Sequence, residues 1–213
     1  MNMGVASGRK PRPLSLVTNG KRRAHTDVEL ARAFQSGQSW AVSEVWHRLA
    51  PMVLAMSERC LGSRAEAEDV TQEVFYHVFR KANTLRDPES LRAFVYSFAI
   101  RILKSELRRR RVRAWLSFGD VPSSYHPVAA PDVELRDLLA RFYRLLDRLS
   151  SRDRLVFVLR RIEGMTAEEI AAHMAISVST VKRSMKYASQ QLTRWVDADA
   201  RLKELLTAEV IPV

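Results

Sequence analysis

Hydrogen-bonding side chains recur at helical spacing near the C-terminal end of the chain, opposite an apolar stripe. Within the segment 178–192 the stripe is formed by Val181, Met185, Ala188 and Leu192. The side chains outside the stripe are hydroxyl, basic and amide groups with one tyrosine: Ser179, Thr180, Lys182, Arg183, Lys186, Tyr187 and Gln190. Such groups donate hydrogen bonds to base edges or to phosphates, so the chemistry that this face supports is recognition of DNA.

The segment 166–196 predicts two helices joined by a tight turn. Thr166 and Glu169 have the spacing of a capping box, and Ser177 is a suitable N-cap for the second helix. This is the pattern of a helix-turn-helix, whose second helix enters the major groove. The first turns of such a helix lie deepest in the groove, which favours three residues as readers of bases: Thr180, Lys182 and Arg183. A solvated basic face on an amphipathic helix pair is the alternative interpretation.

A second basic helix is expected upstream, from Pro88 to Arg113. Asp87 is a suitable N-cap, and a proline is tolerated at the first helical position because the N–H there has no intrahelical partner. The four consecutive arginines 108–111 cannot all face one direction, so some are expected to be solvated or to touch phosphates. Tyr96 is placed to stack on an unpaired base, and a buried tyrosine explains the same pattern nearly as well.

An acidic helix is expected to begin after Ser63, which has capping-box spacing to Glu66. Its N-terminal half is rich in acidic and amide groups, among them Asp69, Gln72 and Glu73. Acidic residues near a helix N-terminus are favoured by the helix dipole, which is one explanation. Their density in a basic protein also indicates a surface for a basic protein partner rather than for DNA.

The composition indicates a globular, mostly helical protein with a polyanionic partner. The chain has 213 residues, of which 46% are hydrophobic, with only 7 glycines and 8 prolines. Its formal net charge of +11 is typical of proteins that bind nucleic acid and less often of those that bind acidic membrane surfaces. No segment has strong enough alternation to predict a strand, so the fold class is expected to be all-α.

Catalytic, metal and membrane motifs are not found in the sequence. The one cysteine, Cys60, excludes an internal disulfide and a multi-cysteine zinc site, and the five histidines lack the spacing of metal ligands. No phosphate-binding loop or hydrolase motif is present. We therefore expect no enzyme activity, no cofactor and no metal. Because there is neither a long apolar run nor a secretory signal, we expect a cytoplasmic protein without membrane insertion.

Changes in periodicity and in glycine and proline content divide the chain into five expected parts. They are a disordered basic tail at 1–25, a helical domain at 26–112, a flexible linker at 113–131, a second helical domain at 132–197 and a C-terminal tail at 198–213. The second domain is expected to contain four helices in a winged-helix-like helix-turn-helix arrangement.

Four segments in this order resemble the bacterial extracytoplasmic-function sigma factors, the small two-domain members of the sigma-factor family. They are AEDVTQEVFYHVFRKANTLR at 67–86, SLRAFVYSFAIRILKSELRRRR at 90–111, LSSRDRLVFVLRRIEGMTAEEIA at 149–171 and SVSTVKRSMKYASQQL at 177–192. As a set they are more specific than the helix-turn-helix alone, which many regulators share. The resemblance covers about residues 28–195.

The resemblance implies partners and roles for these segments. It implies that 26–112 is sigma region 2, whose acidic helix would bind core RNA polymerase through Asp69, Gln72 and Glu73. The residues implied to melt and read the minus-ten element of promoter DNA are Asn83, Arg92, Tyr96, Arg101, Lys104, Arg108 and Arg109. The domain 132–197 would be sigma region 4, whose helix-turn-helix reads the minus-thirty-five element. Regulation by an anti-sigma factor is common in the family.

Three positions depart from the family pattern. Ser97 stands where arginine is usual, Arg101 where asparagine is usual, and Ala175 in the turn where glycine is common. If residue 175 requires a positive φ angle, alanine costs about 1 kcal/mol relative to glycine.

We therefore expect a sigma factor that binds core RNA polymerase and directs transcription initiation at specific promoters. The alternative is a stand-alone dimeric helix-turn-helix regulator, which predicts a palindromic site and a dimer surface. The sequence has no sustained heptad pattern for dimerisation, and this alternative gives the upstream domain no purpose.

Overall fold

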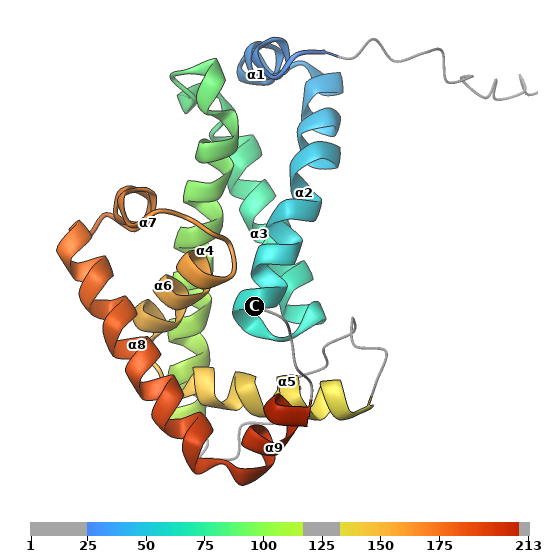
Figure 1. Ribbon diagram of the computed structural model, residues 1–213. Coiled ribbons are helices and arrows are strands. Elements are labelled where there is room, and N and C mark those ends of the chain that lie inside the picture. The colour runs from blue at the N-terminus through green and yellow to red at the C-terminus, as the bar shows by residue number, and fades with distance from the viewer. Residues whose placement is uncertain (1–24, 117–132, 209–213) are drawn as a thin grey trace, which may run out of the picture.

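The computed structural model describes residues 25–116 and 133–208, and all regular elements in these two ranges are helices (Figure 1). The N-terminal half contains α1 (Asp27–Gln35), α2 (Ser39–Leu61), α3 (Arg64–Arg80), the 3-10 turns η1 (Ala82–Thr84) and η2 (Pro88–Ser90), and α4 (Leu91–Leu116). The C-terminal half contains α5 (Val133–Asp147), α6 (Ser151–Arg161), α7 (Ala167–Met174), α8 (Val178–Ala198) and α9 (Ala200–Ala208). The all-α prediction is confirmed.

The N-terminal half is a helical bundle in which α3 packs between α2 and α4 (Figure 1). Two of its helices, α1 and α3, begin at side-chain caps, and Ser63 of α3 is the cap that the sequence predicted, whereas Gln38 before α2 makes no side-chain cap bond. The Thr26 hydroxyl accepts from the Glu29 N–H at 3.2 Å, and the Glu29 carboxylate accepts from the Thr26 N–H at 2.9 Å, which completes a capping box. The Ser63 hydroxyl accepts from the Glu66 N–H at 3.4 Å, but Glu66 turns away and pairs with Arg110.

Pro51 lies inside α2, although a proline in a helix interior removes a backbone hydrogen bond and favours a break or a kink. The helix runs from Ser39 to Leu61 without interruption and ends at Gly62, whose φ of 74° is the left-handed conformation expected of a C-terminal glycine. The many apolar contacts of α2 are consistent with this outcome. Val45, Val53 and Met56, on both sides of the proline, are fully buried, and this packing stabilises the helix on both sides of Pro51.

The C-terminal half places α6, α7 and α8 around a small core, with α5 and α9 at its other end (Figure 1). The expected cap Ser177 accepts from the Thr180 N–H, and Ser150 caps α6 by accepting from the Asp153 N–H. Thr166 and Glu169 form the predicted capping box. The Thr166 hydroxyl accepts from the Glu169 N–H at 3.1 Å, and the Glu169 carboxylate accepts from the Thr166 N–H at 2.7 Å.

Three of the expected boundaries differ from the described structure. The basic helix was expected from Pro88, whereas Pro88–Ser90 form the 3-10 turn η2 and α4 begins at Leu91. The linker was expected from residue 113, whereas α4 continues to Leu116, and the remainder of the linker up to 132 lies outside the described residues. The segment 198–213 was expected to be a tail, whereas α9 occupies Ala200–Ala208 and buries Leu202 completely. The expected tail at 1–25 lies outside the described residues except for His25, which stacks on Trp40.

The two halves pack against each other. α4 contacts both α6 and α7, and α2 contacts α6. One cluster of buried apolar side chains therefore extends from Val95 and Leu103 of α4 to Leu155 and Ile170 of the C-terminal half. Nothing in the periodicity of either half predicted this contact, because each half already has an amphipathic pattern that explains its own core.

Candidate nucleic-acid and protein interfaces

The outer face of α8 presents the predicted DNA-reading side chains. Ser179, Lys182, Arg183, Lys186, Tyr187 and Gln190 are exposed, and Thr180 is half-buried. Thr180 and Ser179 are oriented at the start of the helix by the cap Ser177, whose hydroxyl lies 2.8 and 2.9 Å from theirs. The buried side of α8 differs slightly from the prediction, since Ser184 is buried and Met185 is only half-buried.

The turn that positions α8 requires a left-handed residue. Ala175 has φ 53° and ψ 50°, and it is the one residue other than glycine with positive φ in the described parts of the chain. Its N–H donates to the carbonyl of Ala172 at 3.4 Å, while the Ile176 N–H donates to that of Ala171 at 3.1 Å. These bonds end α7 and set the angle at which α8 begins.

The predicted minus-ten residues lie along one long helix and the turn before it. Asn83 is exposed in η1, and Arg92, Arg101, Arg108 and Arg109 are exposed on α4. With 1.5 Å of rise per residue, Arg92 and Arg109 are separated by about 26 Å along the helix. The nine residues from Arg92 to Arg101 correspond to about two and a half turns, so Arg92 lies on the opposite side of α4 from Arg101. Arg101, Lys104, Arg108 and Arg109 share one side, where DNA would contact several basic groups at once.

An open hollow of about 690 Å³ lies on the C-terminal part of α4. Its lining is strongly basic: Arg101, Lys104, Ser105, Arg108, Arg109, Val112 and Arg113. Glu106 compensates part of this charge, because its carboxylate binds Arg113 at 2.8 Å and Arg109 at 3.4 Å. The hollow is a suitable site for phosphate groups, which accept hydrogen bonds from arginine without sequence preference.

Two aromatic side chains of α4, Phe94 and Phe98, lie at the edge of the core rather than inside it. Both are half-buried, their ring centroids are 5.0 Å apart, and the guanidinium of Arg101 lies 5.3 Å from the Phe98 ring. Tyr96 is also half-buried and faces the C-terminal half, with its ring 6.3 Å from that of His173. The helical spacing alone could not distinguish core positions from half-buried ones on α4. The part of α4 that α6 and α7 cover depends on tertiary packing.

One of the four consecutive arginines is not available to DNA. Arg110 is 8% exposed and donates to the carbonyl of Leu61 at 2.7 Å and to the Glu66 carboxylate at 3.2 Å. Arg108, Arg109 and Arg111 are exposed. The sequence correctly indicated that the four arginines must point to different sides of the helix, and the structure identifies Arg110 as the buried one.

The expected polymerase-binding residues lie on α3. Asp69 and Gln72 are exposed, whereas Glu73 is half-buried and lies 3.9 Å from Arg109. Beside them, a hollow of about 560 Å³ between α2 and α3 is lined by apolar groups such as Trp46 and Leu54 and by several polar or acidic ones, including Gln72 and Glu68. The two acidic groups of the hollow, Glu58 and Glu68, both pair with Arg64, which also lines it, so their charge is partly compensated. The apolar part of the hollow is suited to contact with a protein partner.

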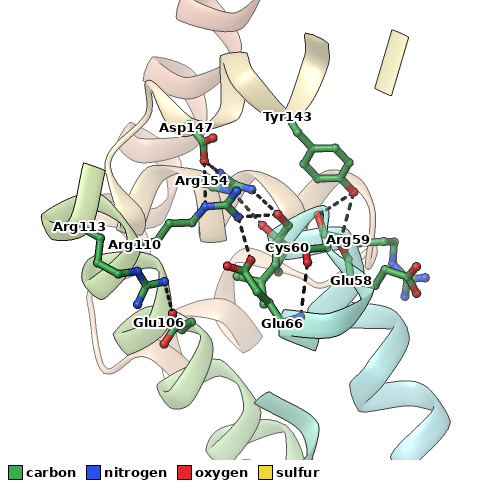
Figure 2. A network of polar contacts seen from close by, with 12 residues as sticks. Glu58, Arg59, Cys60, Glu66, Glu106, Arg110, Arg113, Tyr143, Asp147 and Arg154 are labelled. Atoms are coloured by element: carbon green, nitrogen blue, oxygen red, sulfur yellow. Dashed lines mark hydrogen bonds and ion pairs between the residues drawn. The ribbon is translucent and has the colours of Figure 1, made fainter. Parts of the chain in front are cut away.

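A set of polar contacts between the two halves was missed by the sequence analysis (Figure 2). Arg154 of α6 donates to the carbonyl of Cys60 at 2.9 Å and to that of Leu61 at 3.4 Å, and it pairs with Asp147. Arg59 binds Glu163 with two bonds, at 2.6 and 3.0 Å. Except for Arg154 and Asp147, these partners are about one hundred residues apart in the sequence, so no local spacing relates them.

Burial changes the acid–base properties of three groups at this boundary. The pKa of Cys60 rises to about 12 because its thiol is fully buried, so it stays protonated and unreactive. Burial likewise raises the pKa of Tyr143, whose hydroxyl lies 3.4 Å from the carbonyls of Glu58 and Arg59. Burial lowers the pKa of His173, with a smaller opposing effect of Glu169.

The described ranges contain no group of three or more histidine, cysteine, aspartate or glutamate residues arranged to hold a metal ion. Within the same ranges, none of the helices combines the length and apolar character needed to span a membrane.

Comparison with known proteins identifies relatives for both halves. A family model described as Sigma-70 region 2 matches residues 45–113, and one described as Sigma-70, region 4 matches residues 139–192. The ferric citrate uptake sigma factor FecI of Escherichia coli is 30% identical over 129 residues, which cover 59% of this chain and 73% of FecI. The ECF RNA polymerase sigma factor SigE of Mycolicibacterium smegmatis is 29% identical over 161 residues, which cover 72% of this chain and 60% of SigE.

A solved structure has the same arrangement of helices. It contains CnrH, an RNA polymerase sigma factor of Cupriavidus metallidurans, in complex with the cytosolic domain of CnrY. The TM-score is 0.59 and the identity 27%, over 82% of this chain and 99% of CnrH.

Proposed function

This chain belongs to the extracytoplasmic-function sigma factors, and on that premise we propose which of its surfaces bind promoter DNA and which bind RNA polymerase. Sigma factors direct promoter recognition by RNA polymerase and are not enzymes.

The minus-thirty-five element is read by the outer face of α8, and this face is the observation that carries the proposal. It combines exposed hydroxyl, basic and amide groups on the second helix of a helix-turn-helix. Thr180, Lys182 and Arg183 lie in the first two turns and contact bases, because these turns enter the groove most deeply. Lys186, Tyr187 and Gln190 extend the contact along the groove.

The minus-ten element is bound by α4 and η1. Asn83, Arg92 and Tyr96 lie toward the N-terminal end, where an unpaired base can stack on an aromatic ring. The basic hollow around Lys104 and Arg108 follows the phosphates of the adjoining DNA. The Phe94–Phe98 pair with Arg101 provides a second aromatic surface close by.

Core RNA polymerase binds the acidic surface of α3 around Asp69, Gln72 and Glu73. The apolar hollow between α2 and α3 supplies buried contact area beside these charges. The protein acts in the cytoplasm, where RNA polymerase is found. An anti-sigma factor is a further expected partner, in line with the CnrH–CnrY complex.

Charge reversal on α3 tests the polymerase contact. Asp69→Lys should weaken the binding of core polymerase about tenfold, because complementary charge is replaced by like charge at the interface. The matched control is Asp197→Lys, which makes the same change in net charge at an exposed position of α8. Affinity is measured by titration of labelled core polymerase with the full chain.

Glu73 needs a separate variant because it also faces Arg109. The double variant Asp69→Lys/Glu73→Lys should bind core polymerase more weakly than Asp69→Lys alone. Equal affinity of wild type, Asp69→Lys and the double variant, all with native helix content, would place the polymerase contact elsewhere.

A further inference from the structure

A side chain of α1 holds the loop that carries Asn83. Gln35, the last residue of α1, donates from its side-chain amide to the backbone carbonyl of Leu85 at 2.8 Å. Leu85 lies in the η1–η2 loop (residues 82–90), which packs against α1 (Figure 1). The bond therefore joins two segments that are 50 residues apart in the sequence.

The bond acts on a stretch of backbone without regular secondary structure. Residues 85–87 separate the two 3-10 turns and belong to neither. The Leu85 side chain is 2% exposed, so it anchors the loop in the core, and the Leu85 N–H donates to the Ala82 carbonyl at 3.2 Å. A carbonyl beside a buried side chain costs free energy when it has no partner. The Gln35 amide therefore favours the backbone conformation in which the Leu85 carbonyl faces α1.

The end of α1 is a rigid support for this bond. Phe34, directly before Gln35, is fully buried, and its ring centroid lies 6.1 Å from that of Phe79 in α3. Directly after Gln35, the Ser36 N–H donates to the Arg32 carbonyl at 3.1 Å, which closes the last turn of the helix. The backbone of Gln35 is thus fixed on both sides, and its side chain reaches the loop from a constant position.

Two exposed side chains lie next to the anchored residue in the sequence. Asn83 is two residues before Leu85, and Arg86 directly follows it. The amide of Asn83 has both donors and an acceptor, so it can discriminate between bases, whereas Arg86 can contact the phosphates of any sequence. Hydrogen bonds weaken steeply when their angles are poor. Rotation of the peptide group at Leu85 would therefore reduce base discrimination by Asn83 far more than it would reduce binding to phosphates.

We propose that Gln35 is a positioning residue for base recognition in the minus-ten element, because it holds the η1–η2 loop in the conformation that presents Asn83 to an unpaired base. Gln35 acts through the loop and does not touch DNA. The inference rests on the proposed function, which assigns Asn83 to this element. It extends the minus-ten site to α1, a helix that contains none of the site residues predicted from the sequence.

Removal of the amide donor from the full chain tests this role. Gln35→Met keeps a side chain of similar length without a hydrogen-bond donor, and Gln35→Lys keeps an N–H donor at its end. Because Gln35 is exposed, neither change leaves a cavity in the core. The matched control is Gln38→Met, which removes an exposed amide that bonds Ser36 and Trp40 rather than the loop.

Hydrogen–deuterium exchange of the free protein measures the loop itself. The amides of residues 82–90 should exchange several-fold faster in Gln35→Met than in wild type, because the loop opens more often. Gln35→Lys and Gln38→Met should exchange at the wild-type rate. Equal exchange in wild type and Gln35→Met would overturn the proposal, and this measurement uses neither polymerase nor DNA.

Base preference is measured with the holoenzyme that core polymerase forms with each variant. The probe is a pool of random single-stranded DNA of about 12 nucleotides, and sequencing of the bound fraction gives the base preference at each position of the enriched motif. Gln35→Met should lower the preference at one position about three- to tenfold, as expected for one neutral hydrogen bond. Its affinity for the whole pool should change less than about twofold, because phosphate contacts remain. Gln35→Lys and Gln38→Met should retain the wild-type preference.

Asn83→Ala connects the effect to the proposed base-reading residue. It should lower the preference at the same position as Gln35→Met. The double variant Gln35→Met/Asn83→Ala should show no further loss beyond Asn83→Ala alone, because both changes remove one contact. The positioning role is overturned if the two losses add, if Gln35→Met loses affinity equally for every sequence, or if Gln35→Lys does not retain the preference.

Failure of the proposed function gives a different result. If wild-type holoenzyme shows no base preference, or if Asn83→Ala leaves the preference unchanged, the assignment of Asn83 to the minus-ten element fails. If Asn83→Ala removes the preference and Gln35→Met does not, that assignment stands and Gln35 has no positioning role.

Discussion

At the scale of the residue, Ala175 carries a backbone strain that glycine would remove. Its φ of 53° is unfavourable for a residue with a Cβ atom. Ala175→Gly should therefore raise the free energy of unfolding of the C-terminal half by about 1 kcal/mol. The matched control is Ala172→Gly, at an exposed position inside α7, which should lower it by about 1 kcal/mol. Urea denaturation measures both, and a less stable Ala175→Gly variant would contradict the assignment.

Arg183 is the residue on which the reading of the upstream element can be tested most sharply. It is exposed in the second turn of α8, and its guanidinium lies 3.5 Å from the Thr180 hydroxyl. Arg183→Ala should reduce the discrimination between matched and mismatched upstream elements by about 1–3 kcal/mol. The control Arg194→Ala removes the same charge from an exposed position farther along α8. Binding affinities for upstream elements that differ by single bases distinguish the effect of Arg183→Ala from that of Arg194→Ala.

One outcome of that experiment would contradict base reading by Arg183. If Arg183→Ala weakens binding equally on every sequence, as expected for Arg194→Ala, then Arg183 contacts phosphate rather than a base.

At the scale of the element, α9 is the helix that the sequence analysis did not predict. Leu202 is fully buried against α5 and α8, and the Asp199 carboxylate caps the helix by accepting from the Leu202 N–H at 3.0 Å. Leu202→Ala should lower the free energy of unfolding of the C-terminal half by about 2–5 kcal/mol, because it leaves a cavity. Arg201→Ala, at an exposed neighbouring position, should change it by less than about 0.5 kcal/mol.

Thermal or urea denaturation of the two variants measures the difference. Equal stability of Leu202→Ala and Arg201→Ala would mean that α9 contributes nothing to the domain. The signal for this helix was present in the sequence, since Asp199 precedes Leu202 at capping distance. It was weak because α9 has only nine residues and begins directly after α8.

At the scale of the whole molecule, the sequence predicted what depends on local spacing. The caps at Ser63, Thr166 and Ser177 and the all-helical fold follow from short-range patterns, and the structure confirms them. The exposed positions of most candidate DNA-binding residues follow from the same helical periodicity, whereas Tyr96, Lys104 and Thr180 are half-buried. The family resemblance added the roles of these faces.

The contact between the halves could not be predicted in the same way. Arg154 in the sequence is an ordinary basic residue of an amphipathic helix, and only the folded chain shows that it caps α2. Ser97 and His173 are 76 residues apart, and Arg59 and Glu163 are 104 apart. Pairings at such separations depend on the tertiary arrangement, which periodicity does not determine. The half-buried state of Tyr96 has the same origin.

Promoter recognition by this protein is tested by transcription in vitro with purified core RNA polymerase, with and without the protein, on fragmented genomic DNA of the source organism. Transcripts should start at defined sites only when the protein is added, and the DNA upstream of these sites should share two separated motifs. Transcription indistinguishable from that of core polymerase alone, with a protein that is folded, would contradict it.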